Sequence, residues 1–232
     1  MTRTYWAAVC AVVLALLFAA GAVTVAAGNG NERHGGAASA ASRTPGEDSA
    51  DAGFARDMSV HHQQAVEMSF IVRDRTKDED VRRLAYDIAN TQANQRGMML
   101  GWLDLWELPK TSPDEPMAWM AGAGTDGGGH GGHGTHGAGG AHEARDGALM
   151  PGMATRADLA KLREADGEQA EILYLKLMTA HHKGGVTMAR GCADRCEVGA
   201  QRSLARGMVD AQASEIALMA DLLKERGASL RP

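Results

Sequence analysis

One eleven-residue pattern occurs twice in this chain and constrains its fold more than any other feature. Met58–Met68 contains a methionine, two adjacent histidines, a small residue and a second methionine, and Met178–Met188 repeats them in order. Every matched position is offset by 120 residues. An α-helix turns by about 100° per residue, which places all these positions on one side. A helix normally buries that side, so the pattern predicts two equivalent helices with nitrogen and sulfur donors facing inward.

A second motif extends the repeat beyond a single helix. Gln92, Gln95 and Met99 follow the first histidine pair, and glutamine, glutamate and methionine occupy the positions 120 residues later. Each half therefore indicates a helical hairpin, and two hairpins make the four main helices of a four-helix bundle. Amides on an inner face need hydrogen-bond partners, which the adjacent histidine pair is expected to supply.

Helix start and stop signals refine these hairpins. A capping-box pattern makes Thr76 the expected N-cap of the second helix, which should end near Trp106, and Thr155 the expected N-cap of a short helix. A long helix after Gly167 and a final helix complete the second half. The other expected helices span about 51–75, 77–106, 156–165 and 197–226, and the long helix after Gly167 carries the second motif through Met188.

Composition divides the remaining chain. An uninterrupted apolar run reaches Ala27 and is either a cleaved signal peptide or a membrane anchor, so the rest should lie outside the cytoplasm, secreted or anchored to the cell membrane. The expected organisation is 1–27 as this segment, 28–50 as a flexible linker, 51–108 and 150–232 as the hairpins of one domain, and 109–149 as a disordered Gly/His-rich insert.

The glycine-rich insert contains His130, His133, His136 and His142. Flexible imidazoles can gather around an ion, so the insert is either an auxiliary metal collector or a low-complexity linker with incidental histidines. Neither reading makes it a tight site.

Cys192 and Cys196 are four residues apart. Outside the cytoplasm a disulfide is the first expectation, and it requires that the helix end there. Copper-binding thiolates are the second alternative and free thiols the third. A net charge of −5 gives no electrostatic case for nucleic acid as a partner.

The donor chemistry of the repeated motif favours copper. Thioether sulfur selects Cu(I) over hard cations, and imidazole suits both Cu(I) and Cu(II). Calcium and magnesium prefer oxygen ligands, and structural zinc prefers closely spaced cysteines and histidines. The Glu-x-x-His motif of di-iron bundles is absent from the sequence, as is any recognisable catalytic constellation, so no enzymatic activity and no organic cofactor are expected.

The paired motifs resemble those of the family known as domain of unknown function 305 (DUF305). The similarity covers about 53–103 and 150–223, and it departs at the Gly/His insert and the two cysteines. It implies a ferritin-like helical fold, and some members are exported copper-binding proteins linked to copper resistance. Carried over by position, the implied metal ligands are Met58, His61, His62, Met68, Met99, Met178, His181, His182, Met188 and Met219.

Three functions follow as hypotheses. The first is copper sequestration or transfer outside the cytoplasm, with a metal-accepting protein as a further partner and Cu(I) favoured over Cu(II). The second is a helical module that binds a partner protein without metal, its histidines and glutamines forming a buried polar network that fixes helix register. The third is a copper redox enzyme. The sequence leaves open the oligomeric state and whether the repeats form one shared metal site or two.

Overall fold

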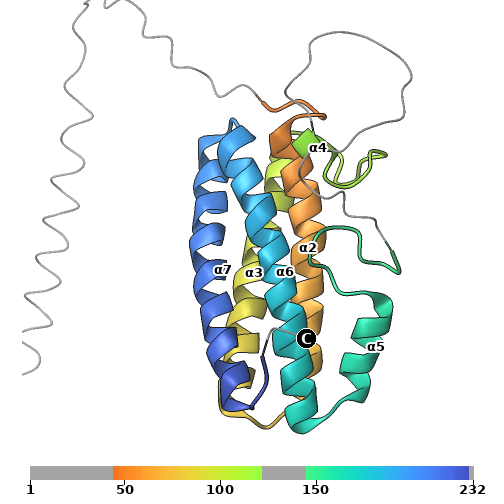
Figure 1. Ribbon diagram of the computed structural model, residues 1–232. Coiled ribbons are helices and arrows are strands. Elements are labelled where there is room, and N and C mark those ends of the chain that lie inside the picture. The colour runs from red at the N-terminus through yellow and green to blue at the C-terminus, as the bar shows by residue number, and fades with distance from the viewer. Residues whose placement is uncertain (1–43, 122–144, 230–232) are drawn as a thin grey trace, which may run out of the picture. The chain divides into compact units, whose positions relative to one another are not determined.

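The computed structural model describes residues 44–121 and 145–229, and every regular element in these ranges is a helix (Figure 1). Two hairpins dominate: α2 (Ala50–Arg75) with α3 (Glu79–Leu105), and α6 (Gly167–Arg195) with α7 (Gly199–Glu225). The connection between them contains α4 (Ala118–Ala121) and α5 (Arg156–Glu164). The all-helical prediction is confirmed.

Several predictions concern residues that lie outside the described ranges. These are the apolar segment 1–27, most of the linker and the four histidines of the insert. Among the helices of the described ranges, none is both long enough and apolar enough to cross a membrane.

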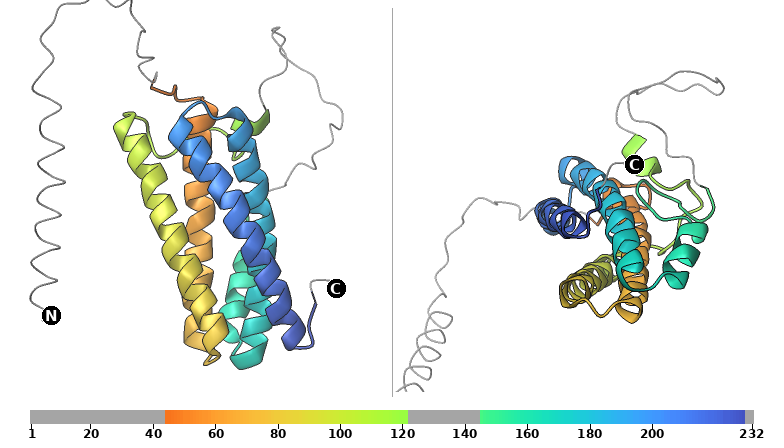
Figure 2. Two further views of the ribbon diagram at one scale, coloured as in Figure 1. Left: turned by 90° about the vertical axis from the view of Figure 1, so that its left-hand side faces the viewer. Right: turned by 60° about the horizontal axis from the view of Figure 1, so that its bottom comes forward.

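The two hairpins meet through their first helices. α2 packs against α6, α3 flanks α2, and α7 flanks α6; α5 lies on the opposite face of the central pair (Figure 2). The motif positions of the central helices face inward, because Met58, His61, His62, Ala65 and Met68 all have an exposed fraction of 0%. The predicted inner stripe is therefore confirmed.

The helix caps correct one prediction and confirm another. The N-cap of α3 is Asp78, whose side chain accepts a hydrogen bond from the Val81 N–H, and not Thr76. Thr76 instead ends α2, and its Oγ1 donates to a carboxylate on α6. Thr155 is the predicted N-cap of α5 and forms a capping box with Asp158. Both Thr76 and Asp78 have side-chain oxygens that can cap a helix, so the sequence pattern allows either as the N-cap. Thr76 contacts Glu171 of α6, and Asp78 is the N-cap.

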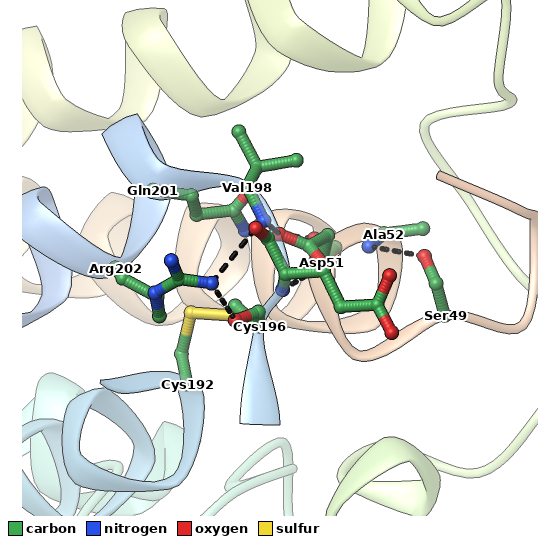
Figure 3. Close-up of a disulfide and its surroundings, with 9 residues drawn as sticks. Ser49, Asp51, Ala52, Cys192, Cys196, Val198, Gln201 and Arg202 are labelled. Carbon is green, nitrogen blue, oxygen red and sulfur yellow. Dashed lines mark hydrogen bonds between the residues drawn. A yellow bond between two sulfur atoms is a disulfide. The ribbon is translucent and has the colours of Figure 1, made fainter. Parts of the chain in front are cut away.

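Two buried carboxylates at equivalent positions, Asp51 and Glu171, tie each hairpin to the loop of the other. Asp51 Oδ2 and Oδ1 accept from the N–H groups of Glu197 and Val198 at 2.8 and 3.0 Å, at the start of α7 (Figure 3). These two N–H groups belong to the α7 N-cap, Val198, and to the residue before it, and they have no partner within the helix. Glu171 accepts from Thr76 in the loop between α2 and α3.

The cysteine pair forms a disulfide at the end of α6, which is the first of the three predicted alternatives. Cys196 is the C-cap, so the helix ends where the bridge closes, as the sequence reasoning required. Arg202 Nη1 donates to the Cys196 and Glu197 carbonyl oxygens beside the bridge (Figure 3). The disulfide and Asp51 thus hold the same inter-helix loop.

The two ends of the predicted insert have defined structure, which corrects its boundaries. Residues 109–121 lie against α2, where Arg56 donates to the Pro109 carbonyl oxygen and Trp119 is buried against Phe54. Residues 145–149 form a turn that ends in a buried Ala148. Apolar and aromatic side chains on these flanks find a surface on the helices, which composition alone does not reveal. The prediction for 122–144 concerns residues outside the described ranges.

Candidate metal centre

Four buried histidines occupy the middle of the central helix pair. His61 of α2 and His181 of α6 meet at the helix interface, with ring centroids 3.7 Å apart and an interplanar angle of 33°. His62 and His182 reach outward to the flanking helices, where they contact Gln95 of α3 and Glu215 of α7. Each motif therefore makes the same link, in which its second histidine joins a central helix to the other helix of the same hairpin.

Every one of these histidines uses Nε2 for a hydrogen bond to an oxygen atom. His62 bonds Gln95 Oε1 at 2.8 Å, and His182 bonds Glu215 Oε2 at 2.7 Å. His181 bonds the His61 carbonyl oxygen at 3.0 Å, and His61 bonds the Pro151 carbonyl oxygen at 3.3 Å. These oxygens only accept, so Nε2 is the donor in each neutral ring and Nδ1 has a free lone pair.

The Nδ1 atoms are buried and, within residues 44–121 and 145–229, have no hydrogen-bond partner. The same holds for both polar side-chain atoms of Gln92 and for Gln212 Oε1. The prediction that histidines would serve the glutamines is therefore confirmed for Gln95 and wrong for Gln92. Buried polar atoms normally find partners, so this set indicates a place for a ligand.

Burial favours the neutral form of three of the imidazoles, those of His61, His62 and His181. Desolvation, aided by the neighbouring His62, lowers the pKa of His61 from 6.5 to about 3. Desolvation also lowers the pKa of His62 to about 4, although its bond to Gln95 opposes the shift. Desolvation also holds the pKa of His181 well below 6.5, and the neighbouring His61 adds to the effect. Neutral imidazole is the form that binds a metal ion, so these rings need not lose a proton first.

The motif methionines separate into two clusters, one at each end of the histidines. One cluster contains Met58, Met99 and Met188, and the other contains their equivalents. The cause is the antiparallel packing of α2 and α6, which brings the first methionine of one motif beside the second methionine of the other. All ten predicted residues are buried, at 0–1% exposure: Met58, His61, His62, Met68, Met99, Met178, His181, His182, Met188 and Met219.

A segment that the sequence reasoning missed covers one side of the histidines. Gln64 exchanges two hydrogen bonds with the Ala154 backbone, at 2.7 and 2.9 Å, and so fixes residues 150–154 over the central helices. The segment approaches so closely that a Cβ atom at Gly184 would overlap the Pro151 carbonyl oxygen. The adjacent glycines of the second motif were a signal of close approach. A second close approach occurs at Gly185, where Gln212 of α7 occupies the space of the missing side chain.

The donor set fits a soft metal ion better than a hard one. In the part of the chain that the structure describes, no three His, Cys, Asp or Glu side chains come together as a metal site. An ion in this core would therefore need thioether sulfur beside imidazole nitrogen, which is a ligand set for copper rather than for magnesium, calcium or structural zinc. The Nε2 bonds to carbonyl and carboxylate oxygens are the outer partners that metal-binding histidines usually have.

Comparison with known proteins gives the family. The sequence profile of DUF305, a domain of unknown function, matches residues 51–223. A crystal structure of a candidate secreted DUF305 protein from Streptomyces coelicolor is 63% identical, with a TM-score of 0.67 over 79% of this chain and 98% of that one. A DUF305 fragment from Deinococcus radiodurans is 28% identical, with a TM-score of 0.57 over 76% and 96%.

A more distant structure shares the fold. CopM in its Cu(I)-bound form is 18% identical, with a TM-score of 0.53 over 75% of this chain and 96% of CopM. No curated protein matches the sequence. The match to the family covers most of the chain, including both histidine pairs and the helices that follow them. This protein therefore belongs to the DUF305 family.

Proposed function

We propose that this protein binds copper through its His/Met core outside the cytoplasm and holds it for sequestration or for transfer to an accepting protein. Cu(I) is the preferred state, because thioether sulfur is a soft, neutral donor. The two methionine clusters flank the histidines from both ends, so we place a soft site at each end. The equivalence of positions 120 residues apart supports an origin of the two hairpins by duplication.

The observation that carries the proposal is the state of the four histidines. Each donates from Nε2 to a fixed oxygen, and each leaves a buried Nδ1 lone pair without a partner. A ring held in this way is already oriented and already in the correct tautomer for coordination. A polar core selected only for packing would be expected to use both ring nitrogens.

The relatives support the choice of metal and compartment. CopM, which shares the fold, has been crystallised with Cu(I) and with Cu(II) bound. The Streptomyces coelicolor relative is described as a candidate secreted protein, which agrees with an extracytoplasmic location. The apolar segment before Ala27 supports the same location as a signal peptide or an anchor.

A second candidate function is a helical module without metal. The hydrogen bonds from His62 to Gln95 and from His182 to Glu215 favour it, because each links the two helices of one hairpin and fixes their register. This function predicts that the histidines matter for stability alone.

Anaerobic competition of the full chain with a chromophoric Cu(I) chelator separates the two functions. We compare the wild-type protein with the double variant His62→Gln and His182→Gln, since glutamine keeps similar size and hydrogen bonding but removes the imidazole donor. We also compare Met99→Leu with Met98→Leu, a matched pair in which Met99 is buried and Met98 is 47% exposed.

Copper binding at the core predicts weaker Cu(I) retention in the histidine variant and in Met99→Leu, with Met98→Leu behaving as wild type. Equal retention by all four proteins, with intact helical circular dichroism, would leave the metal-free module as the better account.

A further inference from the structure

Methionines outside the repeated motif gather at only one end of the core. Met117, Met120, Met150 and Met153 lie in the connection between the hairpins, and all four pack in the cluster of Met58. The cluster at the other end contains motif methionines but none of these four. The repeat alone would make the two ends equivalent, and this connection makes them different.

The segment that holds Met120 packs closely against one glycine on each central helix, Gly53 on α2 and Gly191 on α6. A Cβ atom at Gly191 would lie 2.8 Å from Cε and 3.2 Å from Sδ of Met120, so the thioether rests against the α6 backbone. On α2, a Cβ atom at Gly53 would lie 2.6 Å from the side chain of Trp119, which belongs to α4. The residues 120 positions away are Leu173 and Ile71, so neither glycine belongs to the repeat.

Met117 is held in an unusual backbone conformation. Its φ of 71° is in the left-handed region, which is unfavourable for a residue with a long side chain. Asp57 maintains it, because Asp57 Oδ2 accepts from the Met117 N–H at 2.7 Å and from Trp119 Nε1 at 2.9 Å. Simple gap filling by methionine would require neither this conformation nor its support.

The added methionines differ in exposure. Met117, Met120 and Met153 are half-buried, whereas Met150 is fully buried. An acidic pocket of about 390 Å³, whose lining also contains Arg56, adjoins the segment that holds Met117 and Met120, since Ala118 and Trp119 form part of its wall. Its carboxylates raise the local concentration of cations; they belong to Glu47, Asp48, Asp57, Asp114 and Glu115.

We propose that Met117, Met120 and Met153 form an uptake site for a soft monovalent cation, and that Met150 connects this site to the motif methionines. Three neutral thioethers hold such an ion without excluding its onward transfer, because thioethers carry no charge to trap it. The inference rests on the proposed function in that the ion moves on to the His/Met core.

The test uses NMR of the full chain with ¹³C-labelled methionine methyl groups and Ag(I) as a diamagnetic probe. Single Met→Leu substitutions, which nearly conserve volume, assign the resonances. We expect the Met117, Met120 and Met153 methyl resonances to shift at substoichiometric Ag(I), with Met98 unmoved as an exposed control. In the triple Met→Leu variant, the motif methionines should respond to Ag(I) more slowly, with helical circular dichroism intact.

The outcomes separate this inference from the proposed function. If the motif methionines shift while Met117, Met120 and Met153 stay unmoved to saturation, the uptake site is wrong and copper binding in the core stands. If only the three half-buried methionines shift, the uptake site stands and the core proposal is wrong. If no methionine responds, both are wrong.

Discussion

Acidification should destabilise the metal-free protein through its buried histidines. The folded protein holds the pKa of His61 near 3 and that of His62 near 4, and that of His181 well below the usual 6.5. The unfolded chain exposes these rings and binds protons as the pH falls below 6.5. The unfolded state then holds more protons than the folded state, so the free energy of unfolding decreases as the pH decreases.

The magnitude follows from proton linkage. Between about pH 7 and about pH 5.5, a histidine protonated only in the unfolded chain removes about 1.2 kcal/mol from the free energy of unfolding. His61, His62 and His181 together should therefore remove about 4 kcal/mol over this interval. The loss should continue as pH falls towards 4, the folded pKa of His62. Carboxylates contribute little above about pH 5.5, because their unfolded pKa values are about 4.

Urea unfolding followed by circular dichroism, with a strong copper chelator present, measures this loss. The variant His62→Gln lacks one titrating ring, so its loss over the same interval should be smaller by about 1.2 kcal/mol. An unfolding free energy that stays constant from about pH 7 to about pH 5.5 would refute the reasoning, as would equal losses in the two proteins.

Three further perturbations probe the fold around the site, each by urea unfolding. Gly184→Ala should cost about 3 kcal/mol because its Cβ overlaps the Pro151 carbonyl oxygen, whereas Gly207→Ala, in open space on α7, should add about 0.5 kcal/mol. Glu171→Gln should cost about 2 kcal/mol, since it removes the shorter of the two ion pairs of Arg226, at 2.6 Å, and leaves the pair with Asp78 at 3.0 Å; the exposed Glu168→Gln should change little. Reduction of the disulfide should cost about 2 kcal/mol, because the loop between Cys192 and Cys196 is short. A Gly184→Ala or Glu171→Gln protein with the unfolding free energy of the wild type would contradict the role given to that contact. Equal stability before and after reduction would contradict the role given to the disulfide.

Patterns within one helix predicted much of this structure. The helical period placed Met58, His61 and His62 on a buried face, and the offset of 120 residues identified equivalent positions on both hairpins. Local chemistry also identified the Thr155 cap and the disulfide at the end of α6. These features depend on residues close together in sequence, so periodicity and spacing reveal them.

Features that depend on how α2 meets α6 were not predicted. The antiparallel packing of these helices separates the motif methionines into two clusters, and no periodicity within a helix encodes that direction. Gln64 meets Ala154, and His61 meets Pro151, across a separation of 90 residues only because the connection folds back over the histidines. Asp51 and Glu171 carried a usable signal, since both are acidic at the repeat offset and both precede an apolar stripe.

We propose that the buried Nδ1 atoms receive the metal ion while Nε2 stays protonated. Long-range ¹H–¹⁵N NMR of the histidine side chains, recorded with and without Ag(I), reports on both nitrogens of each ring. We expect the Nδ1 resonances of His62 and His182 to shift on binding, while their Nε2 atoms remain protonated and bonded to Gln95 and Glu215. Nδ1 resonances that stay unchanged at saturating Ag(I) would contradict it.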